Sequence, residues 1–428
     1  VYEEGWLSQF LAFLENEDIS TLTYSEYLDR RPSLGLVYLP PASYEEMMEW
    51  ALEPAAFDRF RSLKNAVPAE ARRFLRGGYF REFFLKYPEG NHLHKRMLLI
   101  SRKIRENLCP EASAELYKAQ CNDPYWHGVF GGLYLPHLRE SAYEHLIQAE
   151  NNLPLSPGWE AHDYDLDGRE ELFYRTPRFN LVLRPAFGGS LVEFDDRLLH
   201  RNLSDVLSRR PESYHRQDDL KQAEGGRSIH EQARRLPPGA ASLLRYDWHP
   251  RYSLLDHFLH PETTLEKFQS VDYGEQGDFV NQEYNFILGG TSARLFRDGH
   301  IWAGDHRHPL RVAKRIEPGE GGLTITYDIE NDGEQKMALL FGVEWNFYLL
   351  PHEWQLRKQT ISLLGGEWLL DFGGGAEVWS FPLQTLSQSE EGYDIIQQGM
   401  CFLPHWTFAL AGREKFSLVI ALRKGHES

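Results

Sequence analysis

The sequence predicts a multidomain α+β protein, in which a helical N-terminal part is followed by a large antiparallel β-sandwich. Apolar residues recur at helical spacing as far as about Asn152. Residues 151–159 are rich in Asn, Pro and Gly and are typical of a linker. Beyond them, apolar and polar residues alternate as in half-buried strands. Helices followed by strands indicate separate helical and sheet layers.

Short helices are predicted in the first part of the chain. Apolar residues from Trp6 to Leu14 recur at helical spacing. Ser43 and Glu46 match a capping box, so we expect a helix to begin at Ser43. Pro54 suits the first turn of a second short helix. On this pattern alone, an isolated helical hairpin is an alternative interpretation.

Two apolar stripes predict a small helical bundle from about Phe80 to Asn152. Because their members are three or four residues apart, each stripe lies on one helix face. The two stripes bracket residues 119–132, so we expect the bundle to hold that loop. The first stripe is Leu93, Met97, Ile100 and Ile104, and the second is Leu138, Ala142, Leu146 and Ala149.

Alternation predicts the strands of the sandwich. One strand carries apolar residues at every second position from Leu323 to Ile329 and stops at residues 331–333, Asn-Asp-Gly, which favour a hairpin turn. A second alternating strand runs from Phe416 to Leu422. Residues 179–183 and 189–194 indicate further strands, and together these segments predict the sandwich.

The loop at residues 119–132 is the most informative segment for function. It combines Asn122, Asp123, Tyr125, Trp126 and His127 with three glycines. An α-glucan presents hydroxyl groups and apolar C–H faces, so amide, carboxylate and aromatic side chains suit its recognition. The glycines permit close backbone approach. The alternative is a buried Asp–Trp cluster that joins two helices.

This run resembles the last sequence motif of glycoside hydrolase family 57, whose retaining α-glucan enzymes include 4-α-glucanotransferases and α-amylases. The resemblance implies that Asp123 hydrogen-bonds sugar hydroxyls and that Trp126 stacks on a sugar ring, with Asn122, Tyr125 and His127 in the same site. Further segments are similar to the 4-α-glucanotransferase branch: residues 3–7, 35–40, 76–78, 87–89, 185–194 and 384–392.

The resemblance also implies the domain organisation. Residues 1–79 correspond to the end of an incomplete (β/α) barrel, with a short strand leading into Tyr38, residues 80–155 to a helical middle domain, and residues 156–428 to a galactose-mutarotase-like supersandwich. Retaining chemistry needs two carboxylates, and in this family the nucleophilic Glu and the acid/base Asp lie on barrel strands. Both are expected upstream of Val1, so we expect no catalytic residue in this chain, which would bind an α-1,4-glucan or maltooligosaccharide but be inactive alone.

Two alternatives to a 4-α-glucanotransferase remain open. One is an α-amylase of the same family, because transfer and hydrolysis differ only in whether a sugar or water accepts the glycosyl group. The other is a stand-alone α-glucan-binding module. A homodimer is also left open by the sequence.

Alternate acids followed by glycine suggest a metal site. Asp163, Asp165 and Asp167 precede Gly168, as in the opening of calcium loops. The EF-hand pattern fails because Tyr174 stands at the twelfth position, where a bidentate Glu is needed. Glu170, Glu171 or a carbonyl could complete a different shell, and an Asp-rich turn is the alternative. We therefore expect no required cofactor, with structural calcium as an open hypothesis.

Composition narrows the partners and the compartment. A formal net charge of −17 would repel nucleic acid and anionic membranes, so neither is expected as a partner. We interpret Arg209 and Arg210 as solvated, and residues 208–238 as a mobile excursion. Three cysteines without a Cys-x-x-Cys pattern indicate neither a disulfide framework nor a zinc knuckle, which favours the cytoplasm.

Overall fold

The computed structural model describes residues 3–39, 42–216, 243–389 and 392–425. The chain divides into two compact units, Val1–Ala42 and Ser43–Ser428. Within the described residues, no helix is long and apolar enough to cross a membrane.

The first unit contains two helices, α1 (Trp6–Asn16) and α2 (Tyr24–Arg30). Thr23 caps α2 in a reciprocal capping box with Glu26. The short strand expected ahead of Tyr38 is not formed, since residues 32–39 carry no regular structure. A strand needs a hydrogen-bonded neighbour, and the described part of this unit has none. Leu34 and Leu36 are fully exposed as a result.

The second unit begins with short helices: α3 (Glu45–Trp50), α4 (Pro54–Ala66), α5 (Ala69–Arg72) and α6 (Glu82–Lys86). Pro54 opens α4, as predicted. The prediction of a capping box at Ser43 is wrong. Instead, Tyr44 is the N-cap of α3, and its side chain makes no capping bond. The side chain of Glu46, which the capping box required, accepts a hydrogen bond from the distant Val129 backbone N–H.

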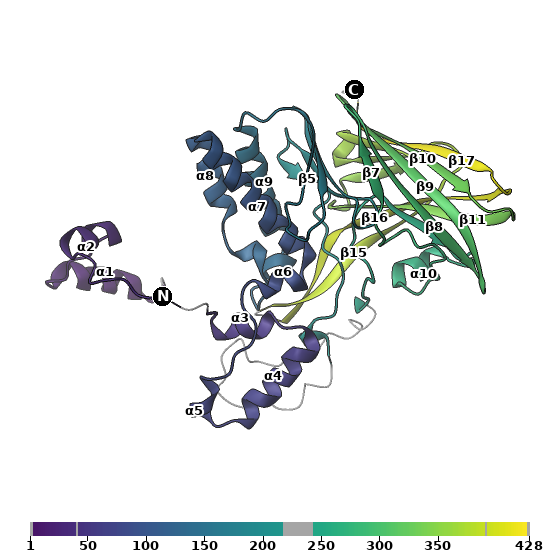
Figure 1. Ribbon diagram of the computed structural model, residues 1–428. Helices are drawn as coiled ribbons and strands as arrows, with labels where there is room; N and C mark the ends of the chain where they lie inside the picture. Colours follow the sequence, from purple (N-terminus) through teal and green to yellow (C-terminus); the bar gives the residue numbers. More distant parts are fainter. Residues whose placement is uncertain (1–2, 40–41, 217–242, 390–391, 426–428) are drawn as a thin grey trace. The chain divides into compact units, whose positions relative to one another are not determined.

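The predicted helical bundle is formed by α7 (Pro88–Asn107), α8 (Pro110–Ala119) and α9 (Pro136–Asn151), which lie side by side in Figure 1. Each helix begins at a proline, whose missing N–H costs nothing in the first turn. The stripe on α7 is buried throughout, and the stripe on α9 is buried apart from the half-buried Leu138. The two stripes meet in one apolar cluster.

The rest of the unit is an antiparallel sandwich, as predicted. A five-stranded sheet has the order β1 (Gly158–His162), β2 (Glu171–Arg175), β3 (Phe179–Arg184), β4 (Ser190–Asp196), β5 (Arg201–Asn202). An eight-stranded sheet has the order β12 (Trp354–Arg357), β13 (Thr360–Leu363), β14 (Trp368–Asp371), β17 (Lys415–Lys424), β10 (Gly322–Asn331), β9 (His306–Gly319), β8 (Ala293–Ala303), β7 (Asn285–Leu288). A four-stranded sheet has the order β15 (Glu377–Ser389), β16 (Gly392–Leu410), β11 (Met337–Phe347), β6 (Leu255–Leu259). The helix α10 (Leu265–Ser270) and the 3-10 turns Ser213–His215 and Leu364–Gly366 complete it.

The predicted hairpin turn after Ile329 is instead a crossover between two sheets. β10 pairs with β9 and β17, whereas the following strand β11 pairs with β6 and β16. Asn331 ends β10 with its side chain buried, and its Nδ2 donates to the carbonyl groups of Gln335 and Ala411. This side chain fixes the chain as it leaves one sheet for the other. The alternating strands pair as expected, with Ile325 opposite Ile420.

Buried ion pairs join the bundle to the five-stranded sheet. Glu150 on α9 lies 3.1 Å from Arg96 on α7 and 2.9 Å from Arg175 on β2, measured between carboxylate oxygen and guanidinium nitrogen. Burial alone would raise the pKa of Glu150, but the two guanidinium groups lower it to about 2. Arg96 also reaches Glu193 on β4 at 2.7 Å. Charged side chains therefore fix the bundle against the sandwich.

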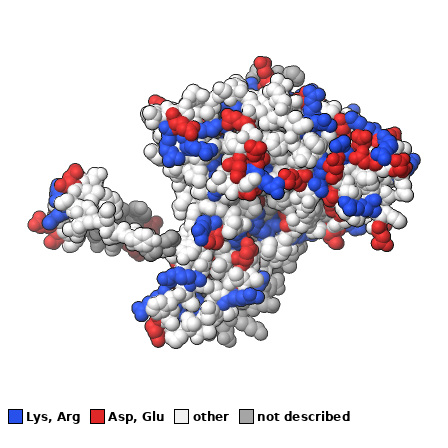
Figure 2. All heavy atoms as spheres, viewed as in Figure 1, with Lys and Arg blue, Asp and Glu red and all other residues white. Residues whose placement is uncertain are grey.

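Residues 208–216 are packed, which corrects part of the predicted excursion. Arg209 is 6% exposed and its Nη2 bonds Asp247, while Arg210 lies 2.8 Å from Glu89 on α7. The arginines were expected in solvent because their carboxylate partners are distant in sequence. Residues 217–238, the rest of the predicted excursion, lie outside the described residues. Figure 2 shows basic and acidic side chains interspersed on the visible face of the sandwich.

Candidate functional site

The loop predicted as a sugar site joins α8 to α9 and contains two 3-10 turns, Asp123–Tyr125 and Gly132–Tyr134. The Leu133 N–H donates to the Trp126 carbonyl at 2.8 Å, so the loop folds back on itself. Gly132 has φ +54°, and a Cβ there would lie 2.2 Å from the Trp126 carbonyl oxygen. Glycine is therefore required for this close backbone approach.

The loop presents a polar edge on a buried base. Cys121, Asn122 and Asp123 are exposed, whereas every residue from 124 to 129 is buried. An Asp123 carboxylate oxygen lies 3.7 Å from Cys121 Sγ. A short polar run on a fixed apolar base can hydrogen-bond a ligand at little cost in chain entropy.

Trp126 belongs to the buried base. Its ring packs edge-on against Tyr44 and Phe83, with centroid separations of 5.9 and 5.8 Å, and the residue is 7% exposed. Its Nε1 is buried and has no hydrogen-bond partner within the described part of the chain. The predicted stacking of a sugar on the open face of this ring is corrected accordingly, because at most an edge is accessible.

Tyr125 and His127 are packed inside the protein. Tyr125 is 3% exposed and its hydroxyl donates to the Ala119 carbonyl at 2.7 Å. His127 is fully buried; its Nδ1 lies 2.7 Å from the Gly131 carbonyl oxygen and its Nε2 lies 2.9 Å from the Tyr214 hydroxyl. Burial lowers the pKa of His127 to about 4, so the ring is neutral at pH 7. Both side chains support the loop in this structure.

Tyr44 and Glu46 lie beside the loop, although sequence reasoning did not select them. Tyr44 is 53% exposed, and burial, with the charges of Glu46 and Asp123, raises its pKa to about 12. Glu46 Oε1 accepts from the Val129 N–H at 3.2 Å. We assigned Glu46 to a capping box, because its contact with residue 129 is long-range and leaves no sequence pattern.

A buried carboxylate anchors the loop from the sandwich side. Glu212 accepts hydrogen bonds from the Tyr87 and Tyr134 hydroxyls at 2.8 and 2.9 Å and lies 2.9 Å from Lys86 Nζ. Tyr134 closes the loop and packs on His127 at 4.2 Å between centroids. This network holds the base of the loop against residues 212–214.

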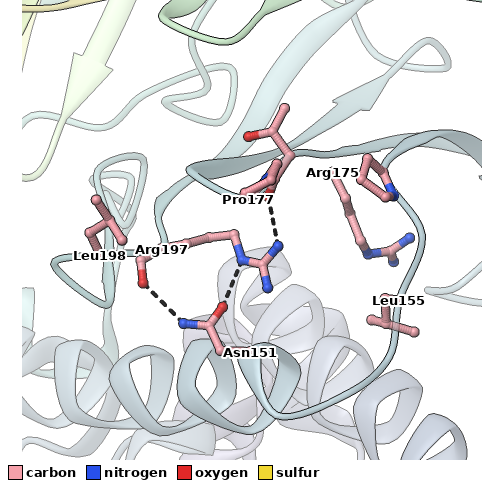
Figure 3. A pocket seen from close by; sticks show the side chains of 8 residues that line it. Asn151, Leu155, Arg175, Pro177, Arg197 and Leu198 are labelled. Carbon is pink, nitrogen blue, oxygen red and sulfur yellow. Dashed lines mark hydrogen bonds between the residues drawn. The ribbon is translucent and has the colours of Figure 1, made fainter.

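Two hollows lie near these elements. A groove of about 320 Å³ borders the loop at the exposed Phe130 and is also lined by Gln388 on β15 and Asp394 on β16. A second hollow of about 350 Å³ lies between the end of α9 and the sandwich. Figure 3 shows that Arg197 there is engaged with Asn151, to which its Nε donates at 2.6 Å. The second hollow contains none of the predicted site residues.

The Asp-rich segment precedes β2 as a tight turn. Asp163 accepts backbone hydrogen bonds from Asp167 and Gly168 at 3.1 and 3.0 Å, and one carboxylate oxygen from each of Asp163, Asp165 and Asp167 lies within 4.8 Å of the others. Glu171 is fully buried beside this turn, and its Oε1 makes no hydrogen bond in the described chain but lies 3.5 Å from Arg184 Nε. Burial, with Asp167 and Asp163, raises the pKa of Glu171 to about 8.

Comparison with known proteins assigns the family. Residues 78–153 match the family described as alpha-amylase/4-alpha-glucanotransferase, middle domain, and residues 163–372 and 360–420 match its C-terminal domain. The bundle and the sandwich make this a multidomain α+β protein, as the sequence predicted. The chain belongs to the alpha-amylase/4-alpha-glucanotransferase family, which confirms the predicted relationship.

Relatives carry both activity names of the family. The chain is 41% identical to the 4-alpha-glucanotransferase of Thermococcus litoralis, over 94% of this chain and 63% of that protein. It is 39% identical to an alpha-amylase of Pyrococcus abyssi, over 94% of this chain and 62% of that protein. The crystal structure of the Thermococcus litoralis 4-alpha-glucanotransferase matches with a TM-score of 0.81 and 37% identity, over 99% of this chain and 64% of that chain. The chain therefore spans just under two thirds of the length of these relatives.

Proposed function

We propose that this chain is the C-terminal portion of a 4-α-glucanotransferase, which transfers glycosyl groups between α-1,4-glucans through a covalent glycosyl-enzyme. The upstream barrel of the same polypeptide would supply the nucleophilic Glu and the acid/base Asp. One observation carries the part assigned to this chain. Asn122 and Asp123 stay exposed on a loop whose next six residues, 124–129, are all buried. Such a fixed carboxylate and amide suit donor-sugar hydroxyls.

Trp126 has a narrower role in this proposal than an open stacking platform. With 7% of its surface exposed, the indole offers an edge to the sugar and positions Asp123 from below. Tyr44, half exposed beside Trp126, supplies a further aromatic surface and a hydroxyl. The groove at Phe130 would accept more distant glucose units of the same chain. Tyr125 and His127 act through the loop that they support.

The proposal places no catalytic residue in this chain and predicts no turnover by the chain alone. Its support is the share of the relatives' length that the chain spans, 63% for the first of them. Exposed apolar side chains from Leu34 to Leu39 add to this support, because a contiguous apolar surface is typical of a contact with another domain. The test is an assay of the purified chain with maltooligosaccharides, which should show neither transfer nor hydrolysis.

The three candidate functions can be distinguished with the polypeptide expressed together with its upstream region. The measurement is an analysis of the products that it forms from maltooligosaccharides. A glucanotransferase converts maltotriose into longer and shorter oligosaccharides while the number of reducing ends stays constant. An α-amylase raises that number, and a stand-alone binding module leaves the substrate unchanged. The upstream coding sequence gives an independent check, since our proposal requires a barrel that carries the Glu and the Asp.

Calcium at Asp163, Asp165 and Asp167 is a further part of the proposal. Glu171 supports it, because its buried Oε1 makes no hydrogen bond in the described chain, lies 3.5 Å from Arg184 Nε, and is close enough to Asp163 and Asp167 for their charges to raise its pKa. One oxygen of Asp165 contacts Arg184, and the other, Oδ1, accepts from the Asp167 N–H at 3.2 Å and keeps a second lone pair for a cation. Calcium should raise the melting temperature of the chelator-treated protein, and Asp163→Asn should remove that increase. An equal melting temperature with and without calcium would mean that the turn is held by its hydrogen bonds alone.

The compartment and the oligomeric state complete the proposal. Cys109, Cys121 and Cys401 are free thiols, which supports a reducing cytoplasm. We also propose that the protein forms a homodimer. A monomeric mass measured by light scattering would rule this out.

A further inference from the structure

A second cluster of chemically active side chains lies inside the sandwich. His257 is on β6, Glu344 is on β11, and His249 precedes β6 in the chain. All three are buried, with exposed fractions of 3% for His249 and 0% for the other two. One nitrogen or oxygen atom from each lies within 4.8 Å of the others. The glucan-binding loop contains none of them.

The hydrogen bonds of the two imidazoles fix their tautomers. Nδ1 of His249 lies 3.0 Å from the Pro250 carbonyl oxygen, and Nδ1 of His257 lies 2.8 Å from Glu275 Oε2. Both partners are acceptors, so in a neutral ring each Nδ1 carries the proton. The two Nε2 lone pairs then face one atom, Glu344 Oε2, at 3.6 Å from His249 and 2.8 Å from His257. Three acceptors that converge in a buried space repel one another unless a proton or a metal ion lies between them.

We propose that His249 Nε2, His257 Nε2 and Glu344 Oε2 bind one divalent transition-metal ion of the zinc type, as a structural site of the sandwich. Metal–ligand distances near 2.0–2.1 Å in a tetrahedral shell separate two ligand atoms by about 3.4 Å. The observed separations of 3.6 and 2.8 Å lie on either side of that value. Two imidazoles and a carboxylate suit zinc, cobalt or nickel better than calcium or magnesium, which prefer oxygen.

The surrounding groups complete the pattern of a metal centre. Glu275 and the Pro250 carbonyl hold the imidazoles by their Nδ1 protons. Glu344 Oε1 accepts from Arg251 Nη1 at 2.8 Å and from Asn346 Nδ2 at 2.7 Å, which leaves Oε2 for the ion. Outer partners of this kind orient the ligands of metal sites and set their affinity.

The net charge of the cluster is negative when both histidines are neutral, which favours binding of a cation. Arg209 and Arg251 face three carboxylates, those of Asp247, Glu275 and Glu344, so the cluster with neutral histidines has one negative charge in excess. A proton is the competitor for this position. Burial alone would lower the pKa of His257, but Glu275 and Glu344 raise it to about 9. Metal binding must therefore displace that proton.

The test measures zinc binding by the purified protein after chelator treatment and dialysis. We expect the wild type to bind about one zinc ion per chain more than His249→Gln, and to melt at a higher temperature with zinc present. Cobalt(II) should give the intense visible absorption of a four- or five-coordinate site. His249→Gln is the gentlest variant, because the side-chain hydrogen bond of His249 goes to the neighbouring Pro250 carbonyl. His306→Gln, at an exposed position on β9, is the matched control and should bind zinc like the wild type.

A second variant keeps the test decisive if His249→Gln unfolds. Glu275→Gln keeps a side chain of similar size but weakens the hydrogen bond to His257, so we expect zinc affinity to fall about tenfold to a hundredfold. Equal zinc content in the wild type and His249→Gln would overturn the proposal. So would a wild-type cobalt spectrum that matches the free hydrated ion, since the buried cluster would then hold a proton in place of a metal.

Discussion

Gly128 controls where the Trp126 indole lies. A Cβ at position 128 would be 2.7 Å from Trp126 Cζ3 and 2.9 Å from Glu46 Oε1, so Gly128→Ala must displace the ring or the carboxylate. We expect a loss of about 1–3 kcal/mol in unfolding free energy, as for other overpacked sites, together with weaker donor binding. Urea denaturation measures the first effect. Gly290→Ala is the control, because a Cβ there meets nothing within 4 Å. Equal midpoints for both variants would contradict this geometry.

Glu150 makes stability depend on pH. Its folded pKa of about 2 lies below the ordinary value of 4.5, so the carboxylate stabilises the fold above pH 4.5, and this contribution is lost as the pH falls toward 2. Glu150→Gln removes one carboxylate from two buried guanidinium groups, although Arg96 keeps Glu193 and Arg175 keeps Glu160. We therefore expect a cost of about 3 kcal/mol at pH 7. The difference between wild type and variant should narrow as the solution is acidified.

Melting temperatures between pH 7 and pH 3 measure this pH dependence. The control is Glu334→Gln, since Glu334 is 80% exposed at its side chain and pairs with the exposed Arg413. We expect its cost to stay below about 1 kcal/mol at pH 7. A constant difference between wild type and Glu150→Gln over the whole range would contradict the proposed role of the ion pairs.

The sequence predicted which loop contains residues suited to a sugar, but it did not predict which of these residues are buried. Asp123 and Asn122 are exposed as a sugar contact requires, while Tyr125 and His127 are inside. Their hydrogen-bond partners explain the difference, since Tyr214 binds His127 from 87 residues away along the chain. Local pattern identifies residue types that suit a ligand, but long-range packing decides which of them reach the surface.

Helix α9 is the element on which the loop depends most directly, because it begins two residues after the Gly132–Tyr134 turn. Leu146 is 1% exposed in the apolar cluster of the bundle, so Leu146→Ala should destabilise the protein by about 2–5 kcal/mol. Leu138→Ala, on the half-buried part of the same helix, should cost clearly less. Urea midpoints compare the two variants. An equal loss would mean that the stripe on α9 is not what holds the bundle together.

Regular elements were predicted well where periodicity is strong. The stripes on α7 and α9 and the alternation in β10 and β17 all appear as expected. The turn at Asn331 was misread because Asn-Asp-Gly favours a tight reversal of the chain whether or not the next strand joins the same sheet. Which sheet a strand joins depends on distant partners, and the turn sequence does not contain that information.

The compact units of the structure separate after Ala42, and α3 packs with the loop through Glu46. Helices α3 to α6 thus lie in the same unit as the bundle. The match to the middle domain of the family begins at residue 78, next to the boundary that the resemblance implied after residue 79. The prediction of an α+β protein with a C-terminal sandwich was correct because it needed only the order of helices and strands.

The most direct measurement is kcat/KM of Asp123→Asn for maltooligosaccharides, in the polypeptide that includes the barrel. Losing a charge-assisted hydrogen bond costs about 1.5–3 kcal/mol, so we expect kcat/KM to fall roughly tenfold to a hundredfold. Asp305→Asn, exposed in the turn between β8 and β9, should leave it unchanged. If Asp123→Asn retained the wild-type kcat/KM, the loop would not contact the glucan, and the function assigned to this part of the chain would be wrong.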